Sequence, residues 1–82
     1  MHAPGEQDQL SIALGRVLAS VRKEAGLTQE QLAYRAGMHP TTISHIERGI
    51  NSPTVRALGN IARQLGVPVA ALLASAEREV AE

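Results

Sequence analysis

Cysteine is absent from this chain of 82 residues, which excludes disulfides and thiolate metal sites and suits a reducing compartment. No apolar run approaches the roughly 20 residues that a membrane span needs. The N-terminus also lacks the pattern of a signal peptide. The length allows one domain with a modest core, which a partner subunit would help to stabilise. We therefore expect a cytoplasmic protein that does not enter the membrane.

Net charge is absent too, because eight Lys and Arg residues balance eight Asp and Glu residues. The charges are unevenly placed along the chain. The segment 15–66 holds seven bases and three acids, a net charge of +4, and the two ends together carry −4. A basic middle between acidic ends fits a protein that meets phosphates on one surface, although so small a total predicts limited non-specific affinity.

Local signals in the middle of the chain predict two short helices joined by a tight turn. Thr28 and Gln31 are spaced as a capping-box pair at the start of the first helix. Gly37 ends it, because the residue just past a helix commonly has a positive φ, which costs glycine little. The second helix starts around His39 with Pro40 in its first turn, where a missing amide does no harm. Leu32, Ala33 and Ala36 share one face of the first helix by helical spacing. Met38 is expected to turn inward after Gly37, and the second helix to bury Ile43 and Ile46.

Three further helices complete a predicted all-α fold of five. One runs from about Asp8 to Ala25, is followed by Gly26 and covers the two-helix unit. A fourth runs from about Thr54 to Leu65 and contains Gly59, for which close packing and simple tolerance are both open. A fifth runs from Pro68 to about Val80. The fourth helix is expected to turn these side chains inward: Val55, Leu58, Ile61, Ala62 and Leu65.

The end of the fifth helix carries more apolar surface than the domain needs. Ala76 and Val80 lie beyond what so small a core can cover, which suggests a dimer contact on the helix at about 68–80. A frayed amphipathic end is the alternative. Residues 1–7 are expected to form a loose arm, so the domain itself spans residues 8–80.

One face of the helix after Gly37 is polar in an unusual way. It carries short hydroxyl, imidazole and guanidinium groups, which can meet base edges and phosphates, whereas a solubilising face is more often Glu and Lys. An ordinary packed helix with a polar outside is the alternative. The residues of this face are Pro40, Thr41, Ser44, His45 and Arg48.

Several segments in order resemble the lambda-repressor-like, Xre-type helix-turn-helix family of bacterial and phage regulators. They are LTQEQLA at 27–33, TTISHIERG at 41–49, SPT at 52–54 and ARQLGV at 62–67. The similarity runs from about Leu14 to Leu73. It implies a sequence-specific transcriptional regulator that binds a palindromic operator in double-stranded DNA as a homodimer, with the third helix in the major groove and without a cofactor.

The resemblance also implies roles for single residues. Pro40, Thr41, Ser44 and His45 match positions that face base edges, and Gln29, Thr42, Arg48 and Asn51 match positions on the phosphate side. Because Pro40 cannot hydrogen-bond a base, direct readout is expected to rest on the other three base-facing residues, with DNA shape contributing more than usual. Arg22 and Glu47 match a partly buried structural ion pair of the family.

Other classes of function fit less well or share the fold. His2, His39 and His45 lack a carboxylate or second histidine at ligand or relay spacing, so we expect neither a catalytic nor a metal site. An antitoxin that binds a toxin protein, a restriction-modification controller protein and a protein-interaction adaptor are alternatives built on the same fold.

Overall fold

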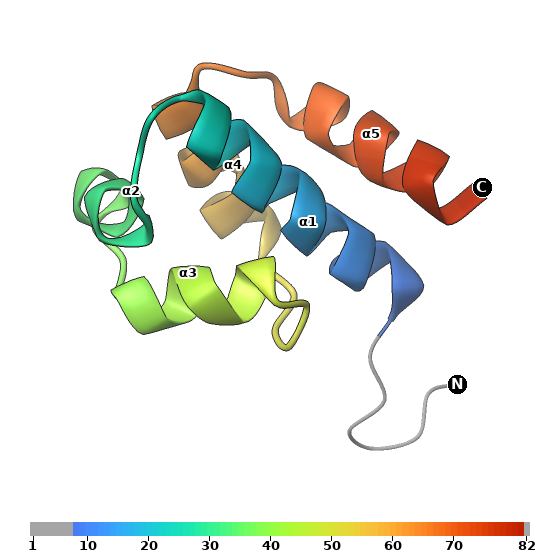
Figure 1. The fold of residues 1–82 in the computed structure, drawn as a ribbon, viewed down its shortest axis with the longest axis horizontal. Coiled ribbons are helices and arrows are strands. Elements are labelled where there is room, and N and C mark those ends of the chain that lie inside the picture. Colours follow the sequence, from blue (N-terminus) through green and yellow to red (C-terminus); the bar gives the residue numbers. More distant parts are fainter. Residues whose placement is uncertain (1–7, 82) are drawn as a thin grey trace.

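The computed structural model describes residues 8–81, and every regular element in that range is an α-helix (Figure 1). This confirms the all-α prediction of five helices. The predicted arm at residues 1–7 lies outside the described residues. The helices are α1 (Gln9–Glu24), α2 (Gln29–Ala36), α3 (Pro40–Glu47), α4 (Val55–Leu65) and α5 (Val69–Ala81).

The helix boundaries follow from local capping chemistry. The Thr28 hydroxyl accepts from the Gln31 amide at 3.0 Å, and the Gln31 side chain accepts from the Thr28 amide at 2.9 Å, so the predicted capping box is present. Thr54 caps α4 through its hydroxyl alone, which accepts from the Ala57 amide at 3.0 Å. Gly37 has the left-handed conformation predicted for it, with a φ of 65°.

The core is shared evenly among the helices. The five largest fully buried side chains come one from each helix: Leu18, Leu32, Ile43, Ile61 and Leu72. α1 lies in the middle, with α3 packed on one side of it and α5 along the other (Figure 1). No helix of so small a domain can bury its apolar stripe alone, so the five helices depend on one another for stability.

Two predictions about burial were wrong. Val55 was expected in the core and is 86% exposed. It is the first residue of α4, and helical side chains lean toward the N-terminus, so it points past the end of the core although its spacing matches the buried stripe. Ala76 was expected to be left over for a partner and is fully buried, because α5 lies along α1. Val80 does remain exposed.

No single helix within residues 8–81 combines the length and apolarity of a membrane span; α4 and α5 meet that test only as a pair, bent by 104°.

Candidate nucleic-acid interface

α2 and α3 form a compact unit with a short turn between them. After Gly37, the Met38 amide donates to the Ala33 carbonyl at 2.8 Å, which turns the chain back across the end of α2. Pro40 is the first residue of α3, where its fixed φ suits the helix. Ile43 and Ile46 lie on one face of α3 and are buried in the core. The opposite face must therefore point away from the core.

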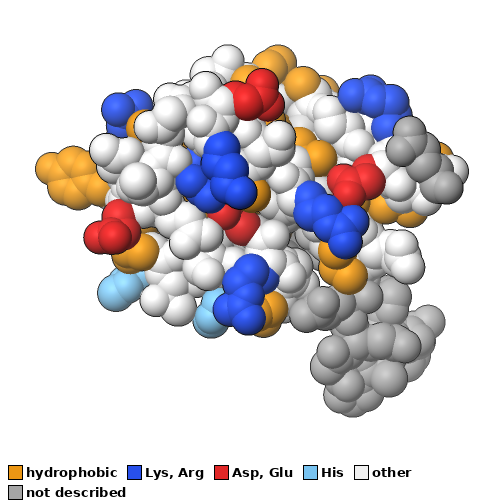
Figure 2. Space-filling view, in the orientation of Figure 1, with side chains coloured by type: hydrophobic (Ala, Val, Ile, Leu, Met, Phe, Trp, Pro, Cys, Tyr) orange, Lys and Arg blue, Asp and Glu red, His pale blue; other side chains and the backbone are white. Residues whose placement is uncertain are grey.

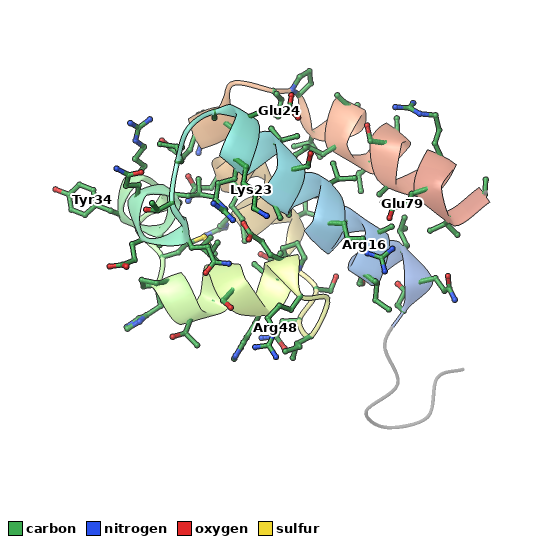
Figure 3. The ribbon with its side chains drawn as sticks, viewed as in Figure 1. Arg16, Lys23, Glu24, Tyr34, Arg48 and Glu79 are labelled. Atoms are coloured by element: carbon green, nitrogen blue, oxygen red, sulfur yellow. The ribbon has the colours of Figure 1, made fainter. Side chains whose placement is uncertain are left out.

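The outward face of α3 and the residue after it hold most of the residues that the sequence predicts for DNA contact; Gln29 is the first residue of α2, and Asn51 lies in the loop after α3. Thr41 and Arg48 are exposed, whereas Thr42, Ser44 and His45 are half-buried. Figure 3 shows Arg48 just beyond α3 on the side away from α1. In Figure 2 the histidine side chains lie along the same edge of the molecule. The outward face thus presents hydroxyl, imidazole and guanidinium groups together.

One buried ion pair ties the end of α1 to the end of α3. Arg22 on α1 donates to both carboxylate oxygens of Glu47 on α3, from Nε at 2.6 Å and from Nη2 at 3.0 Å. Its Nη1 donates to the Leu27 carbonyl at 2.7 Å. The side chains of Arg22 and Glu47 are only 8% and 5% exposed. The hydrogen bonds to Glu47 raise the pKa of Arg22 above its ordinary value, so the guanidinium is firmly charged.

Gln29 belongs to this network as well. Its amide nitrogen donates to Glu47 Oε1 at 2.9 Å, which holds the first residue of α2 against the last residue of α3. A primary amide has a second N–H and a carbonyl oxygen, so this bond leaves polar atoms for a phosphate. The sequence does not reveal the bond, because Gln29 and Glu47 are 18 residues apart and follow no pattern.

The basic charge is spread more widely than the sequence suggests. Figure 2 shows Lys and Arg side chains scattered over the visible face, and Figure 3 places Lys23 on α1, away from the outward face of α3. Arg16 forms an ion pair with Glu79 on α5 at 2.9 Å, and Arg22 forms one with Glu47 on α3. Only part of the +4 charge of the middle segment therefore lies near α3.

Two residues that position the unit have no role in the sequence prediction. Asn60 on α4 donates to the Ala36 carbonyl at 2.6 Å and so fixes the C-terminal end of α2. Gly15 brings α1 directly against α3, since a Cβ placed there would lie 2.4 Å from the Ile46 carbonyl oxygen. A glycine inside a strongly predicted helix was the available signal for Gly15. For Asn60 there was none.

No group of three His, Cys, Asp or Glu side chains that could hold a metal ion occurs in the part of the chain that the structure describes.

Together, the tight α2–α3 crossing and the polar outward face of α3 define a helix-turn-helix domain. The helix-turn-helix family model matches residues 18–72, about two thirds of the chain. The chain therefore belongs to the lambda-repressor-like, Xre-type helix-turn-helix family, and several of its relatives are named as transcriptional regulators or repressors.

Individual relatives agree with this assignment. An uncharacterized HTH-type transcriptional regulator of Sinorhizobium fredii is 43% identical over 54 residues, which cover 66% of this chain and 70% of that protein. The immunity repressor of Bacillus phage phi105 is 34% identical over 62 residues, which cover 76% of this chain and 43% of the repressor.

Solved structures extend the similarity to almost the whole fold. The clp gene regulator ClgR from Corynebacterium glutamicum superposes with a TM-score of 0.86 at 32% identity, over 93% of this chain and 81% of ClgR. The restriction-modification controller protein C.Esp1396I, solved as a tetramer with its 35 base-pair operator, superposes with a TM-score of 0.81 at 30% identity. That match covers 93% of this chain and 100% of the controller chain.

Proposed function

We propose that this protein is a sequence-specific transcriptional regulator that inserts α3 into the major groove of an inverted-repeat operator as a homodimer. The observation that carries the proposal is the two-sided character of α3, with Ile43 and Ile46 buried and Thr41, Ser44 and His45 on the outward face. A helix fits the major groove, where each base pair presents its own pattern of donors and acceptors. The similarity to a controller protein solved on its operator supports the proposal.

Within this proposal the residues keep the roles that the family resemblance implies. Pro40, Thr41, Ser44 and His45 face base edges. The phosphate-side residues are Gln29, Thr42, Arg48 and Asn51. Gln29 stands at the N-terminus of α2, where unpaired backbone amides and the helix dipole favour an anion. The bond from Gln29 to Glu47 then couples the phosphate anchor to the helix that reads bases.

The length of α3 explains why two copies are needed. Eight residues of helix are only about 12 Å long and pass few base pairs. Two copies related by a two-fold axis place their α3 helices in successive major grooves about 34 to 36 Å apart, which doubles the sequence that is read. An inverted repeat matches that symmetry. Binding over or beside a promoter would then block or recruit polymerase.

His45→Ala and Arg48→Ala are expected to affect DNA binding differently. Loss of a base-reading side chain relaxes sequence preference, so His45→Ala should lower the ratio of operator to random-DNA affinity by about tenfold. Loss of a phosphate contact weakens all sequences alike, so Arg48→Ala should reduce both affinities and lower the salt slope by about 1. Fluorescence anisotropy titrations over a range of salt concentrations measure both quantities. An unchanged affinity ratio in the His45 variant would contradict its base-reading role.

Two exposed apolar surfaces are alternative candidates for the dimer contact. The contact that the family resemblance implies on α5 would use Val80. The second surface consists of Ile50, in the loop that leads from α3 to α4, and Val55, the first residue of α4; both are exposed. It adjoins a shallow apolar groove whose lining includes Leu10, Pro53 and Leu73.

The required spacing favours the surface beside α3. α1 lies between α3 and α5 (Figure 1), so a contact through the outer side of α5 would put α1 and α5 of both protomers between the two α3 helices. The protomer measures 34 × 24 × 20 Å, whereas the α3 helices must lie only about 34 to 36 Å apart. A contact through Ile50 and Val55 brings the C-terminal ends of α3 toward the two-fold axis. We propose this contact for the homodimer.

Val55→Asp is accordingly expected to raise the dimer dissociation constant by at least about tenfold, because it places a charge in the apolar contact. The folded protomer should be little affected, since the side chain is exposed. Sedimentation equilibrium measures the dissociation constant. Val80→Asp is the matched control on α5 and should leave the dimer intact. The reverse pattern would place the contact on α5.

A restriction-modification controller protein is the second candidate, because the similarity to C.Esp1396I spans nearly this whole chain. Adjacent reading frames for a methyltransferase and an endonuclease would favour that role. A stoichiometric protein partner in a pull-down would instead favour the antitoxin or adaptor alternatives.

A further inference from the structure

The loop that follows α3 folds back on the helix in a fixed conformation. Gly49 adopts a φ of 74°, which a side chain rarely tolerates, and donates its amide to the Ile46 carbonyl at 3.1 Å. The Ile50 amide donates to the His45 carbonyl at 2.9 Å, and the Asn51 amide approaches the same oxygen at 3.3 Å. The bond from Gly49 to Ile46 and the bond from Ile50 to His45 together form a Schellman motif. The backbone of Asn51 is therefore held beside His45.

This conformation places the Asn51 side chain against the imidazole ring. Asn51 Nδ2 lies 3.4 Å from His45 Nδ1, a long hydrogen bond between two side chains that are six residues apart. An amide nitrogen only donates, so this contact is a hydrogen bond when Nδ1 accepts. A neutral imidazole that accepts at Nδ1 carries its proton at Nε2. In that tautomer the outer ring nitrogen of His45 is a donor.

We infer that Asn51 is a positioning residue that sets the base preference of His45. With Nε2 as a donor, His45 selects a base that offers an acceptor in the major groove, such as guanine or thymine, and disfavours cytosine, which offers only the N4 donor. This inference rests on the proposed function, because it assumes that His45 faces base edges. It adds a specificity role to a loop residue that the family resemblance assigns only to the phosphate side.

Nuclear magnetic resonance of the DNA-free protein tests the tautomer directly. Long-range ¹H–¹⁵N spectra at alkaline pH, assigned with a His45→Gln variant, are expected to show the proton of His45 on Nε2. Asn51→Asp has the same shape but carries a carboxylate that only accepts, so it should move the proton to Nδ1. Ser52→Ala, an exposed change in the same loop, should leave the tautomer unchanged. A parent protein with the proton on Nδ1 would overturn the inference.

Selection from randomised operators tests the consequence for DNA. The position read by His45 is the one whose preference His45→Ala abolishes. There the parent should prefer guanine or thymine over cytosine, and Asn51→Asp should shift that ratio toward cytosine by about tenfold, besides weakening all sequences through its charge. An unshifted ratio would overturn the inference alone. A parent that selects no sequence at all would overturn the proposed function, while the tautomer would still be measured.

Discussion

Glu47→Ala is expected to lower the free energy of unfolding by about 3 to 5 kcal/mol. A domain of this length has only roughly 4 to 12 kcal/mol in total, so the variant should be largely unfolded or melt far below the parent. The reason is that Arg22 would be left charged and buried, with its bonds to Glu47 lost and only the Leu27 carbonyl as a partner. Urea titration followed by circular dichroism measures the change.

Glu79→Ala is the matched control for this prediction. It also removes a glutamate from an ion pair between two helices, but Arg16 and Glu79 are 68% and 35% exposed at their side chains. Water can solvate the arginine that is left behind, so the loss should stay below about 1 kcal/mol. Equal losses in the two variants would show that burial does not govern the strength of these pairs. A parent-like melt of Glu47→Ala would show that its ion pair does not stabilise the fold.

Loss of Glu47 would also remove a bond that holds Gln29 in the proposed DNA-binding interface. Glu47 Oε1 accepts from Gln29 at the start of α2 as well as from Arg22. A Gln29→Ala variant removes only the first of these bonds and leaves the ion pair in place. We therefore expect it to remain folded, with weaker DNA binding that reflects both the loss of the proposed phosphate contact and a less fixed start of α2.

Features that depend on neighbouring residues could be predicted from the sequence. The Thr28–Gln31 capping box, the left-handed Gly37 and the buried faces of α2 and α3 are each determined within one or two helical turns. α1 was expected to run from Asp8 to Ala25. In the structure Asp8 is its N-cap and Ala25 is its C-cap. These local signals, together with the order of several matched segments, were enough for the fold.

Features that depend on how helices pack could not be predicted in this way. Spacing puts Val55 and Leu58 on one stripe, but only the position of α4 in the fold decides that Leu58 is covered and Val55 is not. Ala76 is buried because α5 lies along α1, which no periodicity reveals. The link from Gln29 to Glu47 and that from Asn51 to His45 likewise exist only once α2, α3 and the following loop are assembled.

Gly15→Ala is expected to destabilise the protein by about 3 kcal/mol, at the upper end of overpacking costs. The added Cβ would lie 2.4 Å from the Ile46 carbonyl oxygen and 2.6 Å from that of Glu47. Both are backbone atoms, so no side chain can rotate away, and α1 must move off the C-terminal end of α3. That movement also strains the bonds from Arg22 to Glu47. A fall in Tm of roughly 12 to 24 °C in a thermal melt follows from this loss.

Gly59→Ala separates this steric effect from helix propensity. Both glycines lie inside helices and gain the same intrinsic preference from alanine, but a Cβ at Gly59 meets nothing within 4 Å. The structure thus favours simple tolerance at Gly59, and its replacement should stabilise the protein by about 0.5 to 1 kcal/mol. Opposite signs for the two variants isolate the contact between α1 and α3 as the cause. If Gly15→Ala were also stabilising, the helices would have to pack less closely than the structure shows.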